Sequence, residues 1–434
     1  MKIAWFTPYC RESAIGRYSD VVVRELARFH QVSLWIPDLP TNRAGPVETI
    51  SVRSCSPAAI LRLQEYDLAV YNIGNHYPYH GLIYEFSQSF PGLTVLHDLV
   101  LHHFFASLYL EHQNDPEGYL KLLQTWYGVE IRHTAENALA GRRKSMWESD
   151  DVIRWPLFEP ALENSLGVVT HSEFAREHVA SRFAGPVSRL FLPYDKDQHE
   201  PKIHVSTGRS KILLLSVGQV NRNKRVHAVL NALAFNREFT SKVEYVILGP
   251  VDATYKTECD QIIAAGDLKG VVHFLGRVDD ATLHAYLSRA DICINLRFPV
   301  TETGSASLAE EMLHGKAVIV TNTGCYADVP DDCVYKVSPE QEESDLQQGL
   351  SRLIGDPGER LRMGQCAKAF AEKHFCPGIY IEELTPFMES VCSTAPLLRC
   401  IDRVGNILTT MGVSPEMQIC DTISEQCLMF VEND

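Results

Sequence analysis

Two series of short apolar runs, each run followed by a stretch with helical periodicity, dominate the sequence. The first series lies between residues 2 and 172 and consists of KIAWF, QVSLWI, LAVYNIG, LTVLHD and GVVTHS. The second consists of KILLLSVG, VEYVILG, VVHFLG, DICINL and AVIVTN. Uninterrupted apolar strands are typical of parallel sheets that helices cover on both faces. The sequence therefore predicts an α/β protein with two doubly wound, Rossmann-like domains that face each other across a cleft.

The expected domain boundary lies near residues 191–210, FLPYDKDQHEPKIHVSTGRS, where the apolar periodicity lapses and polar, Pro and Gly residues gather. We expect an N-terminal domain over residues 1–195, with a helical insertion at 101–162. A C-terminal domain is expected over residues 205–375, followed by a helical tail over 376–434.

Composition excludes several classes of protein. The formal net charge of −15 argues against a nucleic-acid partner, because a phosphate backbone attracts a basic surface. The 12 cysteines include no C-x-x-C pair, so we predict neither a zinc site nor a disulfide framework. We find no signal peptide and no apolar run near the roughly 20 residues of a membrane span. We expect a cytoplasmic protein, and leave open a peripheral membrane contact and self-association.

Carboxylates stand out in RFPVTETGSASLAEEMLHG, which follows the strand DICINL. Glu302 lies in the loop after the strand, and Glu310 lies about two turns into the expected helix. The residues around the start of that helix should present free backbone N–H groups to phosphate oxygens; they are Thr303, Gly304, Ser305 and Ala306. Ionised carboxylates accept hydrogen bonds from sugar hydroxyls. The structural alternative is that Glu302 aids the helix dipole and that Glu310 or Glu311 is solvated.

Glu302 and Glu310, separated by seven residues, resemble the E-x7-E motif of glycosyltransferase family 4. The resemblance extends over about residues 1–390 and is strongest at 210–340. Members of that family are retaining enzymes of GT-B fold that use nucleotide-sugars. The resemblance implies that Glu302 contacts the donor sugar and acts in catalysis, and that Glu310 contacts the ribose. The family's Gly-rich link between the two carboxylates is Ser- and Thr-rich here, so we expect a narrower or more polar pocket.

A basic turn follows the strand in LLSVGQVNRNKRVHAVLNAL. Positive charge at a strand end can neutralise a leaving diphosphate. The family usually carries an Arg after the glycine and a Lys five residues later. Lys224 matches the Lys and is assigned a catalytic role, and Gly218 is assigned to the donor site. Gln219 replaces the Arg, so Arg225 or Arg222 supplies the charge, or the donor is held by one cation fewer. A solvated turn that caps the helix is the structural alternative.

A third loop and a first-domain glycine complete the strand-end motifs. In HFLGRVDD the strand ends at Gly276, and the resemblance implies that Arg277 and Val278 hold the base through their backbones.

In WFTPYCRESAIGRYSD, Gly16 joins a strand to a helix. The family has a Gly-containing loop near the transfer site at this position, but a steric role explains a glycine there equally well.

Histidines gather at other strand ends of the N-terminal half. LTVLHD ends at His97 and Asp98, and the family often has a His here that contacts the donor sugar. We assign His97 to catalysis, and Asp98 and Gly16 to the acceptor side. His171 and Ser172 line the cleft or cap a helix. We predict no metal site, since the spacing of His97, His102 and His103 forms no coherent ligand face and the D-x-D at 195–197 reads as a solvated turn.

The resemblance implies a hexosyltransferase, and we expect it to need neither metal nor cofactor. Its expected donor is a UDP- or GDP-linked sugar, and its acceptor is a glycan, a lipid-linked glycan or a protein. The amino-acid sequences of these motifs most resemble those of bacterial enzymes that build polysaccharides or glycoconjugates. One alternative is another sugar-nucleotide enzyme of the same fold, an epimerase or a phosphorylase, of which the phosphorylase is disfavoured because no lysine context for pyridoxal phosphate is found. The other is a sugar-nucleotide-binding sensor or scaffold without turnover, which the Gln219 departure keeps open. The insertion at 101–162 is a hypothetical determinant of acceptor choice or subunit contact.

Overall fold

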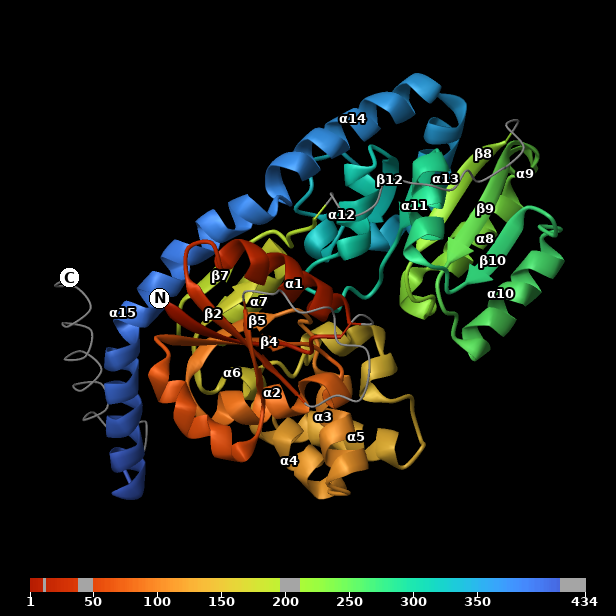
Figure 1. Cartoon of the computed structure of the whole chain (residues 1–434). Coiled ribbons are helices and arrows are strands. Elements are labelled where there is room, and N and C mark those ends of the chain that lie inside the picture. Colours follow the sequence, from red (N-terminus) through yellow and green to blue (C-terminus); the bar gives the residue numbers. More distant parts are fainter. Residues whose placement is uncertain (11–12, 38–49, 196–210, 414–434) are drawn as a thin grey trace.

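The computed structural model describes residues 1–10, 13–37, 50–195 and 211–413, and shows two parallel sheets, one in each half of the chain (Figure 1). The N-terminal sheet is 7-stranded in the order β3-β2-β1-β4-β5-β6-β7. Its strands are β1 Lys2–Phe6, β2 Gln31–Ile36, β3 Ser51–Ser54, β4 Leu68–Ile73, β5 Gly92–Leu96, β6 Ser165–Thr170 and β7 Val187–Arg189. All neighbouring strands pair in parallel.

The C-terminal sheet is 6-stranded in the order β10-β9-β8-β11-β12-β13, again with parallel pairing. Its strands are β8 Ile212–Val217, β9 Val243–Leu248, β10 Val272–Gly276, β11 Ile292–Asn295, β12 Ala317–Thr321 and β13 Tyr335–Val337. The two sheets confirm the predicted α/β class.

Both sheets reverse their winding direction at one place. In the N-terminal sheet the reversal falls between β1 and β4, and in the C-terminal sheet between β8 and β11. The loops that leave the carboxyl ends of two such strands run to opposite sides and leave a crevice, where open α/β sheets bind ligands. The loop after β8 carries Lys224 and the loop after β11 carries Glu302, so the topology places both at the reversal point of the C-terminal sheet.

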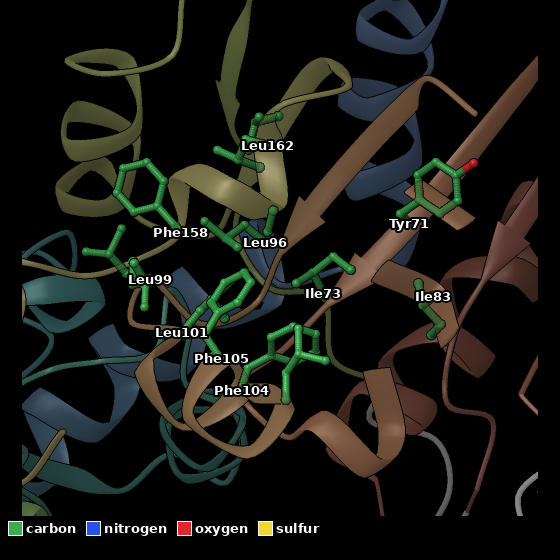
Figure 2. Close-up of a cluster of buried hydrophobic side chains, with 14 of the residues drawn as sticks. Tyr71, Ile73, Ile83, Leu96, Leu99, Leu101, Phe104, Phe105, Phe158 and Leu162 are labelled. Carbon is green, nitrogen blue, oxygen red and sulfur yellow. The ribbon is translucent and has the colours of Figure 1, made fainter. Parts of the chain in front are cut away.

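Helices cover both faces of the N-terminal sheet. They are α1 Ala14–Leu26, α2 Tyr77–Ser89, α3 His102–Ala106, α4 Pro116–Tyr127, α5 Val129–Leu139, α6 Glu159–Leu162 and α7 Glu173–Ala180, with a π-helical turn at Ser107–His112. The helices of the expected insertion extend one of the two cores. Figure 2 shows that core, in which Phe104 and Phe105 of α3 pack with Leu96 and Ile73 of the sheet.

The C-terminal sheet is likewise covered on both faces, and each face has its own apolar core. Its helices are α8 Val226–Phe235, α9 Arg237–Lys242, α10 Ala253–Ala265, α11 Asp280–Arg289, α12 Ala306–Leu313, α13 Glu342–Gly355 and α14 Pro357–His374. Helix α14 packs on this domain, since its residues Ala367 and Ala371 belong to the core.

The last described helix, α15 Pro377–Thr410, returns to the N-terminal domain (Figure 1). Its buried side chains include Leu384, Met388 and Val391, which join the core on the α1 side of the first sheet. Gly167 in β6 permits this contact, because a Cβ atom there would lie 2.8 Å from Val391 Cγ2. The hydroxyls of Tyr18 and Tyr380 are 2.6 Å apart and join α1 to α15.

The expected boundary falls largely at residues 196–210, which lie outside the described parts, as do residues 196 and 197 of the D-x-D sequence. The domain limits therefore stay predictions. Among the residues that the structure describes, no helix has the length and apolarity to cross a bilayer.

Candidate functional site

The loop after β11 binds directly to the N-terminal domain. The N–H groups of Leu99 and Val100 donate to the carbonyl of Thr301, at 2.7 and 3.2 Å, and the N–H of Thr303 donates to the carbonyl of His97 at 2.8 Å. The Thr303 hydroxyl adds a bond of 3.1 Å to the same His97 carbonyl. The two domains therefore meet where the carboxyl ends of β5 and β11 face each other.

This contact corrects one prediction. The expectation of a free N–H at Thr303 is wrong, because that group is engaged with His97. Helix α12 begins at Ala306, and Ser305 is its N-cap, with a side chain that accepts from the Leu308 N–H. Gly304 lies against the N-terminal domain, since a Cβ atom there would be 2.8 Å from the Cβ atom of His171. The N-terminus of α12 is thus held at the domain junction.

Glu302 forms an ion pair with Arg297, whose Nε lies 2.7 Å from Glu302 Oε1. Both side chains are mostly buried, with exposed fractions of 18% and 19%. Burial alone would raise the pKa of Glu302, but the charges of Arg297 and Lys224 hold it below its ordinary value. The carboxylate is therefore ionised at neutral pH. Arg297 was not among the predicted site residues, although its place five positions before Glu302 on the same loop was a usable signal.

Lys224 is buried, and its Nζ donates to Asn295 Oδ1 at 3.3 Å. Gly218, with φ 110°, leaves the room for this side chain, since a Cβ atom there would lie 3.3 Å from Lys224 Cε. Burial and the nearby Arg297 lower the pKa of Lys224, whereas Glu311 and Glu302 oppose that shift. Lys224 therefore lies close enough to Glu302 for their charges to interact.

The other basic residues of the turn after β8 are paired elsewhere. Arg222 forms an ion pair with Glu258, and Arg225 forms one with Glu342 of α13. Gln219 is exposed. The structure thus places Arg297 beside Lys224, where the sequence suggested Arg225 or Arg222 as the second cation.

Glu310 has partners other than those of Glu302, and they come from α1, from α11 and from the segment after β7. The Tyr194 hydroxyl donates a hydrogen bond to it, and His284 Nδ1 of α11 lies 3.5 Å from Glu310 Oε1. Burial raises the pKa of Glu310 to about 7, and the Tyr194 bond and Arg17 of α1 oppose the shift. Tyr194, which the sequence did not single out, thus brings the end of the N-terminal domain to the carboxylate assigned to ribose.

His97 is held in one tautomer by Asn72. The Asn72 amide nitrogen donates to the Phe6 carbonyl at 2.8 Å, so its oxygen faces His97 Nε2 at 3.0 Å and can only accept. Burial lowers the pKa of His97 well below its ordinary value. The ring is therefore neutral, with hydrogen on Nε2 and a lone pair on Nδ1.

Asp98 forms an isolated antiparallel bridge with Glu302 across the domain junction and accepts from the Asn75 N–H at 2.8 Å. Burial raises the pKa of Asp98 to about 7, and the charge of Glu302 adds to the shift. The structure therefore brings Asp98 and Glu302, which the sequence assigned to the acceptor and the donor side, to the same place at the domain junction.

The remaining predicted residues have mainly structural contacts. A Cβ atom at Gly16 would lie 2.6 Å from the Pro8 carbonyl oxygen, which supports the steric reading. Ser172 caps α7. Arg277 is exposed and Val278 packs on the C-terminal core. Among the described residues, no group of three or more His, Cys, Asp or Glu side chains could hold a metal ion.

One family model matches part of the chain. Residues 199–370 match the model of a family described as glycosyl transferases group 1, and this range contains Lys224, Glu302 and Glu310. No curated protein matches the chain.

Solved structures resemble nearly the whole chain. HepE of Anabaena in complex with UDP has a TM-score of 0.60 at 15% identity, over 90% of this chain and 100% of that one. Sucrose-phosphate synthase from Thermosynechococcus elongatus has a TM-score of 0.63 at 14% identity, over 91% and 100%. WaaG, a glycosyltransferase involved in lipopolysaccharide biosynthesis, has a TM-score of 0.55 at 13% identity, over 86% and 97%. These likenesses show the fold: the chain has the two Rossmann-like domains of GT-B glycosyltransferases, and its second domain matches the group 1 family model.

Proposed function

We propose that the protein is a retaining, metal-independent glycosyltransferase that moves a sugar from a nucleoside-diphosphate sugar to a glycan, lipid-linked or protein acceptor. One observation carries the proposal. Lys224, Arg297 and Glu302 converge at the reversal point of the C-terminal sheet, where the loop after β11 docks on the N-terminal domain. HepE, which shares the fold, has been solved with UDP and with UDP-glucose.

The two cations suit the departure of a nucleoside diphosphate. Negative charge grows on the β-phosphate as the glycosidic bond breaks, and preorganised positive groups in a partly dry site stabilise that charge. Lys224 and Arg297 supply two such groups. This pair takes the place that a divalent metal has in metal-dependent transferases.

Polar groups of opposite domains surround the place assigned to the sugar. Glu302 is an ionised acceptor for sugar hydroxyls and an electrostatic partner for the positive charge of an oxocarbenium-like transition state. The Nδ1 lone pair of the neutral His97 can accept a hydrogen bond from a sugar hydroxyl on the N-terminal side. Asp98, with its raised pKa, is positioned to take a proton from an acceptor hydroxyl. The proposal that the anomeric configuration is retained rests on the resemblance to glycosyltransferase family 4.

The test follows nucleoside diphosphate release from UDP-, GDP-, ADP- and dTDP-sugars without added metal. We expect slow release from one donor, and a loss of at least tenfold in Glu302→Gln, because the variant keeps the shape and removes the charge. Glu238→Gln is the matched control, since Glu238 pairs with Lys242 of the same helix, α9, and both side chains are exposed. Release that is equal in both variants contradicts the proposed role of Glu302.

The same experiment separates the alternative function. The exposed Gln219, where the family has an Arg, favours a nucleotide-sugar sensor that binds without turnover. Thermal stabilisation by one donor without release, also after addition of acceptor glycans, supports that alternative. Neither binding nor release with any donor overturns both functions. Cosedimentation with anionic vesicles tests the expected peripheral membrane contact.

A further inference from the structure

Glu311 is a second buried carboxylate behind the proposed diphosphate site. It follows Glu310 in α12, but it points to other partners and is 0% exposed. Its Oε2 accepts from Asn295 Nδ2 at 3.0 Å, and the Oδ1 of the same Asn295 accepts from Lys224 Nζ at 3.3 Å. The amide of Asn295 thus connects Glu311 to Lys224.

Helix packing alone does not explain this residue. Glu311 Oε1 is buried and has no hydrogen-bond partner among the residues that the structure describes. A buried polar atom without a partner is costly, and an apolar side chain of similar size would fill the position without that cost. An ionised Glu311 therefore needs a compensating positive charge. Lys224 is the group that most strongly opposes the rise in the Glu311 pKa caused by burial.

The formal charges of the cluster support the same assignment. Arg297 and Glu302 already form an ion pair. Without Glu311, Lys224 would be a buried ammonium group beside a second cation, with Glu302 as its one remaining carboxylate among the groups that act on it, and it would lose its proton more readily. With Glu311 ionised, the two cations face two carboxylates.

We propose that Glu311 is a positioning residue that, through Asn295, keeps the proton on Lys224. This role rests on the proposed function, in which Lys224 receives the donor diphosphate. The charged groups that act on Lys224 are Arg297, Glu311 and Glu302. The charges of Lys224, Glu310 and Arg297 shift the pKa of Glu311, and the charge of Glu311 raises the pKa of the Cys293 thiol. The Tyr326 hydroxyl donates to Asn295 Oδ1 at 3.4 Å.

The sign of the effect follows from these contacts. Removing the negative charge of Glu311 lowers the pKa of Lys224, because one of the two carboxylates that favour the ammonium form is lost. Lys224 then becomes neutral over a pH interval in which it is charged in the wild type. In that interval the diphosphate loses a cation.

The direct test is NMR titration of protein labelled with 13C at the lysine Cε, with the Lys224 signal assigned from the spectrum of Lys224→Arg. We expect the Lys224 midpoint to fall by about one pH unit in Glu311→Gln, the scale for loss of a close opposite charge. Glu310→Gln is the matched control, because the groups that act on Lys224 do not include Glu310. Equal midpoints in the wild type and Glu311→Gln overturn the proposal.

A second variant guards against a misfolded Gln protein. Glu311→Met removes the same charge and fills the space with apolar atoms. We expect it to fold with lower stability than the wild type, because it removes one partner of a buried charge pair, and the Lys224 midpoint should still fall in the folded variant. A folded Glu311→Met protein with an unchanged midpoint also overturns the proposal.

The consequence for the donor site is measured by calorimetry with UDP from pH 6 to pH 9. We expect the alkaline loss of UDP affinity to begin about one pH unit lower in Glu311→Gln, with affinities that converge at pH 6. A loss of the same factor at every pH indicates a merely structural role and contradicts the proposal. If no nucleoside diphosphate binds the wild type, the proposed function fails, and the NMR titration still decides whether Glu311 controls Lys224.

Discussion

Replacing Arg297 by methionine should destabilise the C-terminal domain, and more strongly at neutral than at mildly acidic pH. The substitution removes the cation that lies 2.7 Å from Glu302 and leaves a carboxylate that is only 19% exposed. Removal of one partner from a fully buried ion pair costs about 3 to 5 kcal/mol. The remaining exposure and the nearby Lys224 reduce this cost, so we expect about 2 to 4 kcal/mol at pH 7.5.

The pH dependence follows from Glu302. In the wild type the folded-state pKa of Glu302 is lowered, so its contribution to stability is present above the unfolded pKa and is lost only as pH falls through the folded value. Without Arg297, burial dominates and the folded pKa rises above the unfolded one. The charged carboxylate then opposes folding at pH 7.5, and protonation relieves this as pH falls. The stability difference between the two proteins should therefore shrink at pH 5.

Urea unfolding followed by far-UV circular dichroism measures the effect. Dichroism reports both domains, whereas all five Trp residues lie between residues 5 and 155 and report the N-terminal half. The dichroism midpoint should fall by roughly 1 M urea at pH 7.5. The matched control is Arg222→Met, whose pair with Glu258 has exposed fractions of 60% and 37% and should contribute at most about 1 kcal/mol. A loss that is equal at pH 7.5 and pH 5, or no greater than in the control, refutes the reasoning.

Two further substitutions test contacts between distant segments. Thr303→Val removes the hydroxyl that donates to the Leu96 carbonyl at 2.7 Å, which should cost about 1 to 2 kcal/mol and let the domain junction open more often. Hydrogen exchange at the Leu99 amide, which bonds across the junction, should then rise about tenfold. Unchanged exchange would show that the Thr303 hydroxyl does not hold the junction closed. Tyr380→Phe removes the bond to Tyr18 and should lower stability by about 1 kcal/mol, measured by thermal unfolding; a more stable variant would show that this hydroxyl pair does not anchor α15.

Local pattern was sufficient for the fold and for part of the site. Continuous apolar strands determine a covered parallel sheet, because each strand must bury both of its faces. The carboxyl ends of such strands gather at one edge, so Lys224 after β8 and Glu302 after β11 could be predicted as neighbours. The resemblance to glycosyltransferase family 4 added roles to those positions.

Charge pairing was decided only by the tertiary structure. Lys224 and Asn295 are 71 positions apart, and no periodicity reports that Asn295 also binds Glu311. Of the arginines near the site, Arg297 faces Glu302, while Arg225 pairs with Glu342 of a later helix.

The domain junction was likewise outside the reach of sequence patterns. The Thr303 N–H, expected to be free at a helix start, bonds to the His97 carbonyl because the two domains close on this loop. The Tyr194 bond to Glu310 arises in the same way. Periodicity describes how a segment faces its own sheet, and for this reason the sequence determined the two domains. Contacts between residues of different domains depend on how those domains meet, so only the tertiary structure decided them.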